Sequence, residues 1–329
     1  MGDAVDTAAL PPGAVFSVAP MMAWTDRHYR VLARMISSCA VLYTEMVTTG
    51  SLRHGDRARH LDFDAREQPL VLQLGGSDPD DMAFAAEQAE AWGYSAININ
   101  CGCPSPRVQR GAFGACLMQE PDTVAACVRA MRASVSLPVT VKCRIGVGRD
   151  DSFEPLARFV DTVAESGVRH FDVHARKAWL DGLSPAQNRD VPPLRYDYVR
   201  QLKTLHPELT IVLNGGLRDW HTISEESRTL DGVMVGREAY QNPWFLAGVD
   251  RRFGGQPQEA GRMDIARDYR DYVAEQIAQG VPLMRCCKHM LGLFNGLAGA
   301  KAFRRHLSEH GPRAPTDISV LDRALDCVA

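Results

Sequence analysis

Residues 94–105 read Tyr-Ser-Ala-Ile-Asn-Ile-Asn-Cys-Gly-Cys-Pro-Ser. Residues 94–99 form an apolar run that predicts a buried β-strand, and the glycine and proline that follow predict a turn directly after it. A structural cysteine is usually buried among apolar neighbours. Cys103, between Gly102 and Pro104, is instead displayed where the strand ends, which suits a nucleophile, an acid or a metal ligand.

The same alternation of strand and helix recurs on both sides of this stretch. Several of the strand candidates are continuously apolar, as expected of parallel strands that are covered on both faces. The expected strands are 15–19, 41–44, 70–74, 94–99, 139–143, 170–174, 210–213 and 232–235. The expected helices between them include 79–92, 122–134, 155–166, 196–205 and 221–228.

Eight strand–helix units over about 230 residues predict a (β/α)8 TIM barrel. The main rival is a doubly wound open sheet, which usually carries a glycine-rich fingerprint after its first strand. Here the first expected strand ends in Ala19-Pro20-Met21-Met22, and neither G-x-G-x-x-G nor G-x-x-x-x-G-K-[ST] occurs in the chain. A Rossmann or P-loop nucleotide site is therefore not expected.

The pattern changes beyond residue 250. Gly254-Gly255-Gln256-Pro257 has the composition of a linker, and helical stretches follow near 262–279, 282–294, 299–310 and 316–327. We expect an N-terminal extension over 1–13, a barrel over 14–250 and an appended helical bundle over 251–329.

The composition is that of an ordinary globular protein, with 45% hydrophobic and 23% charged residues among 329. Nine cysteines without a framework spacing argue against a secreted disulfide scaffold and favour the reducing cytoplasm. The first 15 residues have neither the basic region nor the apolar core of a signal peptide. No apolar run approaches the ~18 residues of a membrane span, so no membrane association is expected.

The net charge of −3 does not by itself suggest a nucleic-acid partner, but its distribution does. Residues 251–329 hold 12 basic and 9 acidic residues, and no acid lies between Glu275 and Glu309. A basic patch on an acidic protein predicts local contact with a polyanion. A solvated helix face is the alternative interpretation.

Polar residues cluster at the expected strand ends, where barrel enzymes place their active sites. Asn214-Gly215-Gly216 follows the seventh strand and Gly236-Arg237 follows the eighth. Barrel phosphate sites are commonly built from these two loops, with glycine backbone N–H groups close to the anion. We therefore expect a phosphorylated ligand, although the glycines could also serve only as tight turns.

Three further strand-end residues offer chemistry. Lys142 has apolar flanks and could form a Schiff base, bind a phosphate or stabilise a negatively charged ring. Gln73 and His174 offer directional hydrogen bonds to a heterocycle, while a histidine satisfied by the core is the alternative for His174. The spacing of Cys101 and Cys103 does not suit a tetrahedral zinc site, so no metal is expected.

Together these segments resemble the tRNA-dihydrouridine synthases from about Ala19 to His310. The segments that carry the resemblance are Ala-Pro-Met-Met-Ala-Trp-Thr-Asp (19–26), Leu-Gln-Leu-Gly-Gly (72–76), Asn-Cys-Gly-Cys-Pro-Ser (100–105), Val-Lys-Cys-Arg-Ile-Gly (141–146), His-Ala-Arg-Lys-Ala-Trp-Leu (174–180), Asn-Gly-Gly (214–216) and Gly-Val-Met-Val-Gly-Arg-Glu-Ala (232–239). Leu-Tyr-Thr-Glu-Met-Val-Thr-Thr-Gly (42–50) is similar to the A subfamily, which acts on D-loop uridines 20 and 20a.

The resemblance implies an FMN-containing barrel, a helical tRNA-binding domain and NADPH as the reductant. It assigns the phosphate of FMN to Asn214, Gly215, Gly216, Gly236 and Arg237. It places Pro20, Met21 and Met22 against the flavin, Gln73 and Lys142 at the pyrimidine edge of its ring, and His174 beside it. Lys142 suits this place because a reduced flavin anion bears charge at that edge.

The implied reaction is hydride transfer from flavin N5 to C6 of uracil, with Cys103 giving a proton to C5. Asn100 and Arg176 would orient a uracil that has left its stack. The tRNA phosphates would be held by Lys288, Arg304 and Arg305, with help from Arg189. No metal and no obligate protein partner are implied.

Three other functions remain open at this point. A flavin barrel could reduce a free pyrimidine or another small conjugated substrate, the chain could be a tRNA-binding protein without activity, or the barrel could be a phosphate-binding lyase without flavin. Two residues depart from the family pattern: Cys101 stands where an apolar residue is usual, and Cys143 where threonine is common. We expect these thiols to be prone to oxidation near the site.

Overall fold

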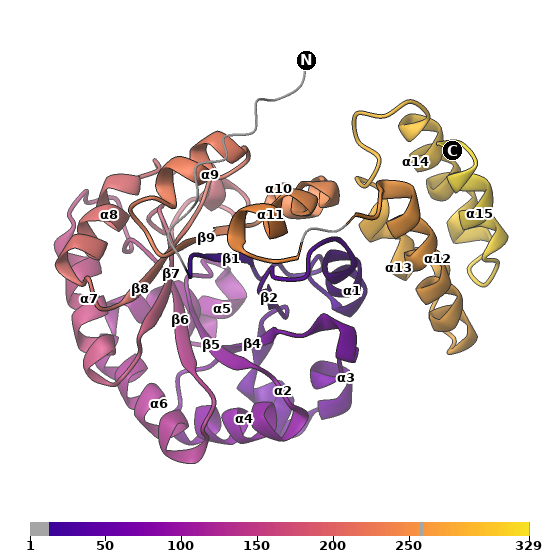
Figure 1. The fold of residues 1–329 in the computed structure, drawn as a ribbon. Coiled ribbons are helices and arrows are strands. Elements are labelled where there is room, and N and C mark those ends of the chain that lie inside the picture. The colour runs from indigo at the N-terminus through magenta and orange to yellow at the C-terminus, as the bar shows by residue number, and fades with distance from the viewer. Residues whose placement is uncertain (1–12, 257–258, 329) are drawn as a thin grey trace. The chain divides into compact units, whose positions relative to one another are not determined.

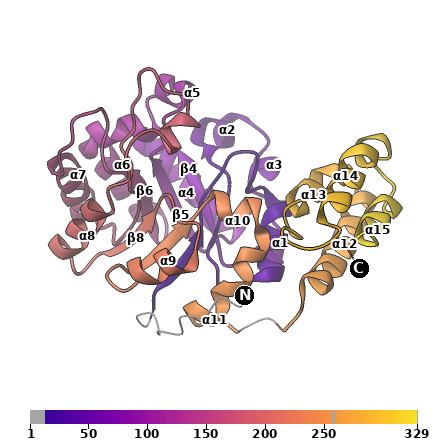
Figure 2. The ribbon, with the colours of Figure 1, turned by 90° about the horizontal axis from the view of Figure 1, so that it is seen from above.

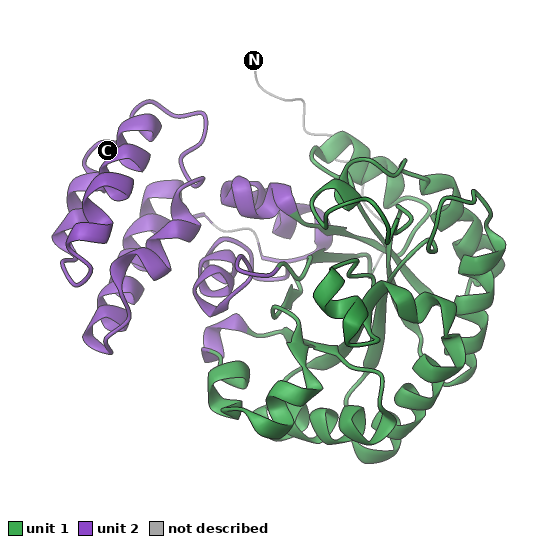
Figure 3. Cartoon of the chain, turned by 180° about the vertical axis from the view of Figure 1, so that it is seen from behind, with its two compact units in different colours: residues 1–21, 41–63, 68–236 green, residues 22–40, 64–67, 237–329 purple. Residues whose placement is uncertain are grey.

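The structure, a computed structural model, describes residues 13–256 and 259–328. Apart from Gly13, the expected N-terminal extension lies outside the described residues. These residues fall into two compact units that are interleaved along the chain (Figure 3). Of the described residues, the first unit comprises 13–21, 41–63 and 68–236, and the second comprises 22–40, 64–67, 237–256 and 259–328. The expected domain boundary at residue 250 stays a prediction.

The first unit is a parallel barrel (Figure 1). Its strands are β1 (Val15–Val18), β2 (Leu42–Tyr43), β3 (Val47–Thr48), β4 (Leu70–Gly75), β5 (Ala96–Cys101), β6 (Val139–Arg144), β7 (His170–His174), β8 (Thr210–Asn214) and β9 (Gly232–Val235). They pair in the order β1-β9-β8-β7-β6-β5-β4-β2, with β3 also on β4. Val18 N donates to Val41 O at 2.9 Å, which links β1 to the segment before β2 and nearly closes the ring. The predicted TIM barrel is confirmed.

Helices surround these strands (Figure 2). They are α2 (Thr49–His54), α3 (Arg57–Leu61), α4 (Pro79–Trp92), α5 (Pro106–Arg110), α6 (Pro121–Ser134), α7 (Glu154–Glu165), α8 (Tyr196–Leu205) and α9 (Trp220–Glu226). The bounds of α4 follow from its sequence. The Asp78 side chain caps Asp81 N, Pro79 occupies the first turn, and Gly93 ends the helix in the left-handed conformation.

The second unit contains the remaining helices. They are α1 (Arg27–Ile36), α10 (Arg237–Gln241), α11 (Val249–Phe253), α12 (Arg262–Ala278), α13 (Leu283–Cys287), α14 (Ala300–His310) and α15 (Ser319–Leu325). The expected helix over 282–294 is too long, because α13 ends at Cys287 and a short 3-10 helix follows. A Cβ atom at Gly292 would lie 2.0 Å from Gln241 O, so this residue packs against backbone. Nowhere in the described ranges is a helix long and apolar enough to cross a bilayer.

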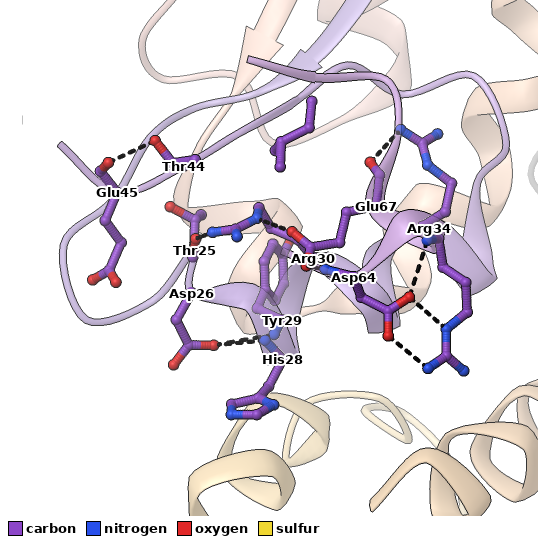
Figure 4. A network of polar contacts seen from close by, with 12 residues as sticks. Thr25, Asp26, His28, Tyr29, Arg30, Arg34, Thr44, Glu45, Asp64 and Glu67 are labelled. Atoms are coloured by element: carbon purple, nitrogen blue, oxygen red, sulfur yellow. Dashed lines mark hydrogen bonds and ion pairs between the residues drawn. The ribbon is translucent and has the colours of Figure 1, made fainter. Parts of the chain in front are cut away.

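Asp26 caps the N-terminus of α1 and anchors this helix within the second unit (Figure 4). Its carboxylate accepts from His28 N at 3.1 Å and also lies 2.8 Å from His289 Nε2 and 3.1 Å from Lys288 Nζ. These partners and the helix N-terminus all favour the ionised form, and the pKa of Asp26 falls well below its ordinary value although burial opposes the change. Asp26 therefore joins α1 to the segment after α13.

A second buried pair joins α1 to residues 64–67 (Figure 4). Arg30 Nε lies 2.5 Å from Glu67 Oε2, and Arg30 Nη1 donates to Thr25 O at 2.6 Å. Both charged side chains are almost fully buried. Breaking a buried pair from one side leaves an uncompensated charge. This explains why the short 64–67 segment belongs to the second unit.

The burial of His28 predicts that the folded protein loses stability in acid. It is 3% exposed, its Nδ1 lies 2.8 Å from Tyr272 Oη, and burial lowers its pKa from 6.5 to about 4, although the Asp26 carboxylate opposes the change. Between pH 6.5 and 4 the unfolded chain therefore binds a proton that the folded chain does not, so stability falls as the pH falls. Over this whole pH range the free energy of unfolding is expected to fall by about 3 kcal/mol.

The measurement is the free energy of unfolding at pH 7.0 and 5.0 for the wild type and His28→Gln, since the amide keeps a hydrogen-bonding partner for Tyr272. The variant is expected to lose less stability on acidification than the wild type. Equal losses in the two proteins would show that His28 does not titrate in this way.

Candidate active site

The loop that carries Cys103 is held by hydrogen bonds from its own backbone. Asn100 Oδ1 accepts from Gly102 N at 3.1 Å and from Cys103 N at 2.9 Å, and Cys103 O accepts from Ala115 N at 3.0 Å. Cys103 is half-buried. Gly114, at φ +77°, lets this turn close, because a Cβ atom there would lie 2.7 Å from Cys103 O. Cys103 thus lies half-buried on a loop whose backbone is fixed by hydrogen bonds, and its display to a ligand stays a prediction.

Arg144, at the end of β6, fastens the same loop from the other side. Its Nε donates to Gly102 O at 2.8 Å, and its Nη1 donates to Lys177 O at 3.1 Å and to Asn188 O at 3.0 Å. Burial lowers its pKa to about 10, which still leaves the guanidinium charged at neutral pH. No role was predicted for Arg144, although a charged residue at the end of an apolar strand is a signal that the sequence contains.

Lys142 and Asn214, which the sequence placed at two separate strand ends, are in direct contact. Lys142 Nζ donates to Asn214 Oδ1 at 2.9 Å, and Asn214 Nδ2 donates to Met234 O at 2.7 Å. Burial lowers the pKa of Lys142 to about 8, while the negative charge of Asp172 opposes the change. The ammonium therefore stays largely protonated at pH 7, in a position to stabilise negative charge.

Gln73 and Asn100 are also brought together. Asn100 Nδ2 donates to Gln73 Oε1 at 2.9 Å, and Gln73 Nε2 donates to Asn98 Oδ1 at 2.8 Å. All three side chains are buried and lie on neighbouring strands β4 and β5. The Cys103 loop is thus connected through Asn100 to the interior of the barrel.

His174 ends β7 as an uncharged imidazole. Burial lowers its pKa well below the ordinary value, and the nearby charges of Arg144 and Lys142 act in the same direction. It also lies directly against the β8 loop, because a Cβ atom at Gly215 would be 2.7 Å from His174 Cδ2. Because this imidazole is neutral, it can donate or accept a hydrogen bond without adding a positive charge to the site.

The glycines of the two expected phosphate loops differ in whether the surrounding protein requires a glycine. Gly215 and Gly216 have φ of +116° and +71°, and a Cβ atom at Gly216 would lie 2.6 Å from Leu194. At Gly236 a Cβ atom would only make ordinary contacts, 3.6 Å from Ala19 and from Met21 Sδ. The segment that follows β1 and contains Ala19 and Met21 therefore adjoins the end of β9.

Two arginines predicted to contact the substrate lie in the connection between β7 and α8. Arg176 Nη1 donates to Asp190 O at 3.2 Å and also to Pro192 O. Arg189 ends a 3-10 helix, Gln187–Arg189, with an exposed side chain. Arg176 therefore holds the loop that carries Arg189.

The other predicted site residues belong to the second unit. Met22 is 64% exposed, and Arg237 begins α10. Lys288 is engaged by Asp26, as described above, while Arg304 Nη1 donates to Asn295 Oδ1 at 2.7 Å. Arg305 is exposed on α14.

The two unusual cysteines do not lie where a thiol would be oxidised readily. Cys101 and Cys143 are register partners on β5 and β6, and both are fully buried. They alternate along their strands with Asn100 and Lys142, so they face the covering helices. Burial raises the pKa of Cys143 to about 12 and that of Cys101 well above its ordinary value. The expectation of oxidation-prone thiols near the site is wrong, because the reactive thiolate is disfavoured.

Comparison with known proteins gives consistent results. The family model described as dihydrouridine synthase matches residues 17–326. The chain is 51% identical over 320 residues to the tRNA-dihydrouridine(20/20a) synthase of Salmonella typhimurium, covering 97% of this chain and 96% of that protein. It is 53% identical over 310 residues to the protein of the same name from Pseudomonas syringae pv. tomato, covering 94% and 92%.

Among solved structures, a 2-naphthoyl-CoA reductase in complex with 2-naphthoyl-CoA is similar in fold. The TM-score is 0.56 at 9% identity, and the match covers 71% of this chain and 49% of that chain. At this identity the likeness supports the barrel architecture alone.

Proposed function

This chain belongs to the dihydrouridine synthase family of flavin-dependent oxidoreductases, and we propose that it reduces uridines 20 and 20a of tRNA to 5,6-dihydrouridine, using FMN and NADPH in the cytoplasm. The proposal rests on the observation that about half of the residues, over nearly the full length, are identical to those of proteins named for that reaction. The strand-end residues supply chemistry that suits it.

The residues present suit FMN. Neither crowding nor a positive φ requires glycine at position 236, and the close approach of a ligand would account for it. The phosphate would be held by Asn214, Gly215, Gly216, Gly236 and Arg237. Pro20, Met21 and Met22 would pack against the ring, with Gln73, Lys142 and His174 at its polar edge. Lys142 is a suitable partner because its charge is retained at neutral pH.

Bound FMN would supply the hydride that adds to C6 of uracil, after its reduction by NADPH. Cys103 would then release its thiol proton to C5, which completes the reduction of the double bond. Asn100 and Arg144 hold the Cys103 loop, so the thiol would act from a fixed position. Asn100 and Arg176 would orient the uracil after it leaves its stack.

The tRNA would be bound by basic residues on both units. Arg189 is exposed on the first unit, and Lys288, Arg304 and Arg305 lie on the second, in the stretch without acidic residues. Contacts of this kind release counterions, so binding weakens as the salt concentration rises.

Replacing Arg304 and Arg305 together by alanine is expected to weaken tRNA binding and to flatten its salt dependence. Each lost phosphate contact reduces the slope of log K against log salt by roughly 0.7 to 0.9. The affinity is measured by titration at several salt concentrations. The control is Arg267→Ala plus Arg313→Ala, which removes the same charge from exposed positions outside the acid-free stretch. An unchanged slope in the first variant would exclude phosphate contacts by these arginines.

The proposed function is tested by mapping dihydrouridine in tRNA from a strain that lacks its own enzyme, with and without this protein. Restoration at positions 20 and 20a is expected, together with a yellow purified protein. Reduction of free uridine without any change in tRNA would instead identify a reductase of free pyrimidines.

A further inference from the structure

The Cys103 loop turns back on itself after α5, and the segment that closes it packs directly against the cysteine. Ala115 N donates to Cys103 O at 3.0 Å. A Cβ atom at Gly114 would lie 2.7 Å from Cys103 O and 3.4 Å from Cys103 Cβ, so the chain at residue 114 adjoins both the backbone and the side chain of Cys103. The placement of residues 113–115 therefore bears on the placement of the thiol.

Phe113 attaches this closing segment to the barrel. Its half-buried ring lies in a slot between Gly75, at the end of β4, and Gly111, which caps the C-terminus of α5. A Cβ atom at Gly75 would lie 2.8 Å from Phe113 Cε2, and a Cβ atom at Gly111 would lie 2.8 Å from Phe113 Cδ1. Real Cβ atoms do not approach so closely, so the ring occupies space that both glycines leave open.

The turn directly before Phe113 is strained. Ala112 has a φ of +53°, a left-handed conformation that is unfavourable for a residue with a side chain. Such a conformation persists only where the surrounding contacts hold it. Two backbone hydrogen bonds do so here, from Ala112 N to Gln109 O at 3.0 Å and from Phe113 N to Val108 O at 3.3 Å. The seated ring of Phe113 is the side-chain contact that follows this turn.

We propose that Phe113 is a positioning residue for Cys103. The ring, seated between Gly75 and Gly111, holds the strained turn closed, and the closed turn keeps residues 114 and 115 against Cys103. Without the ring, Ala112 can relax and the bond between Ala115 N and Cys103 O loses its support. The catalytic importance of this placement rests on the proposed function, which assigns the proton transfer to Cys103, but the packing of the loop does not.

The test uses the purified full-length protein with its bound flavin. Peptide mapping gives the rate at which iodoacetamide alkylates Cys103, and single-turnover kinetics give the rate of reduction at saturating tRNA. Phe113→Ala empties the slot, and Gly111→Ala crowds it. Because Cys103 is half-buried, opening of the loop exposes its thiol further, and each variant is expected to raise the alkylation rate roughly fivefold. The single-turnover rate constant should fall by a similar factor while tRNA affinity and flavin content are unchanged.

The decisive comparison adds Ala112→Gly to Phe113→Ala. Glycine adopts the left-handed conformation without strain, so the turn needs less support from the ring. The double variant is therefore expected to return the alkylation rate and the single-turnover rate constant toward their wild-type values. Phe113→Leu, which keeps part of the apolar contact, should show a smaller change than Phe113→Ala.

Phe63→Ala is the matched control, because Phe63 is also a half-buried phenylalanine of the first unit. Its ring packs on that of Tyr94, with 4.9 Å between the centroids, and not on the Cys103 loop. This variant should lose stability and leave the alkylation rate of Cys103 unchanged. Cys39 and Cys327, which are half-buried, serve as internal references.

Equal alkylation rates in Phe113→Ala and Phe63→Ala, or a double variant without rescue, would overturn the inference. The two readouts also separate it from the proposed function. If the wild type fails to reduce tRNA but the alkylation pattern appears, the proposed function fails and the control of the thiol loop by Phe113 stands. If tRNA is reduced and the pattern is absent, the proposed function stands and the positioning role fails.

Discussion

Cys103→Ala is expected to lower uridine reduction by at least ~10²-fold while leaving flavin and tRNA binding unchanged. Loss of a general acid typically costs a factor of 10² to 10⁴. The backbone of residue 103, which donates to Asn100 and accepts from Ala115, is retained in the variant. The loop should therefore keep its shape and lose only the proton donor. The measurement is single-turnover reduction of tRNA, with flavin absorbance and tRNA affinity determined on the same sample.

Cys116→Ala is the matched control, because Cys116 is also half-buried and belongs to the same unit. Its thiol lies 3.0 Å from Phe113 O and has no place in the proposed reaction. Equal turnover by the Cys103 variant and the wild type would remove Cys103 as the acid. A fall of similar size in both variants would point to general damage by loss of a thiol.

Gly215→Ala is expected to yield protein that retains flavin at least about tenfold more weakly. The residue has φ of +116°, which a side chain rarely adopts, and its Cβ atom would lie 2.7 Å from His174 Cδ2 and 3.3 Å from Leu194 Cδ2. Backbone strain and overpacking each cost roughly 1 to 3 kcal/mol, and 1.4 kcal/mol corresponds to a factor of ten. The strain is relieved by displacement of the β8 loop or of His174, both of which we assign to the flavin.

Gly182→Ala separates strain from crowding. Gly182 also has a positive φ, +79°, but a Cβ atom there would meet nothing within 4 Å. This control should lose roughly 1 kcal/mol of stability and keep its flavin. Bound flavin per protein is measured by absorbance after gel filtration. Full retention of flavin by Gly215→Ala would show that the β8 loop does not contribute to the site.

The fold could be predicted because the sequence carries the periodicity of the barrel directly. Each expected strand of the barrel appears in the structure, and α4 and α8 have the predicted bounds. The prediction of a single helix over 282–294 was wrong. The apolar content of this stretch is typical of a helix, but the close contact of Gly292 with Gln241 depends on the tertiary structure and is not visible in the local sequence.

The site could be predicted only at the strand ends. The pairing of Lys142 with Asn214 and of Gln73 with Asn100 follows from barrel topology once those residues are placed. Asp172, whose charge acts on Lys142, was missed because a polar residue within an apolar strand indicates only which face it lies on. Its hydrogen-bond partners Tyr43 and Asn98 come from strands far away in the sequence. Arg144 was missed for a similar reason, since its three carbonyl acceptors belong to two separate loops.

The interleaving of the two units matters for anyone who builds chimeras within this family. A graft of residues 251–329 alone would transplant Tyr272 and His289 without His28 and Asp26, their partners on and before α1. A crossover at residue 250 should therefore pair side chains from two different proteins at these contacts, even when the two relatives have high identity. Exchanging residues 22–40 and 64–67 along with the C-terminal segment keeps the inherited contacts together, so the transferable module is a discontinuous set of three segments.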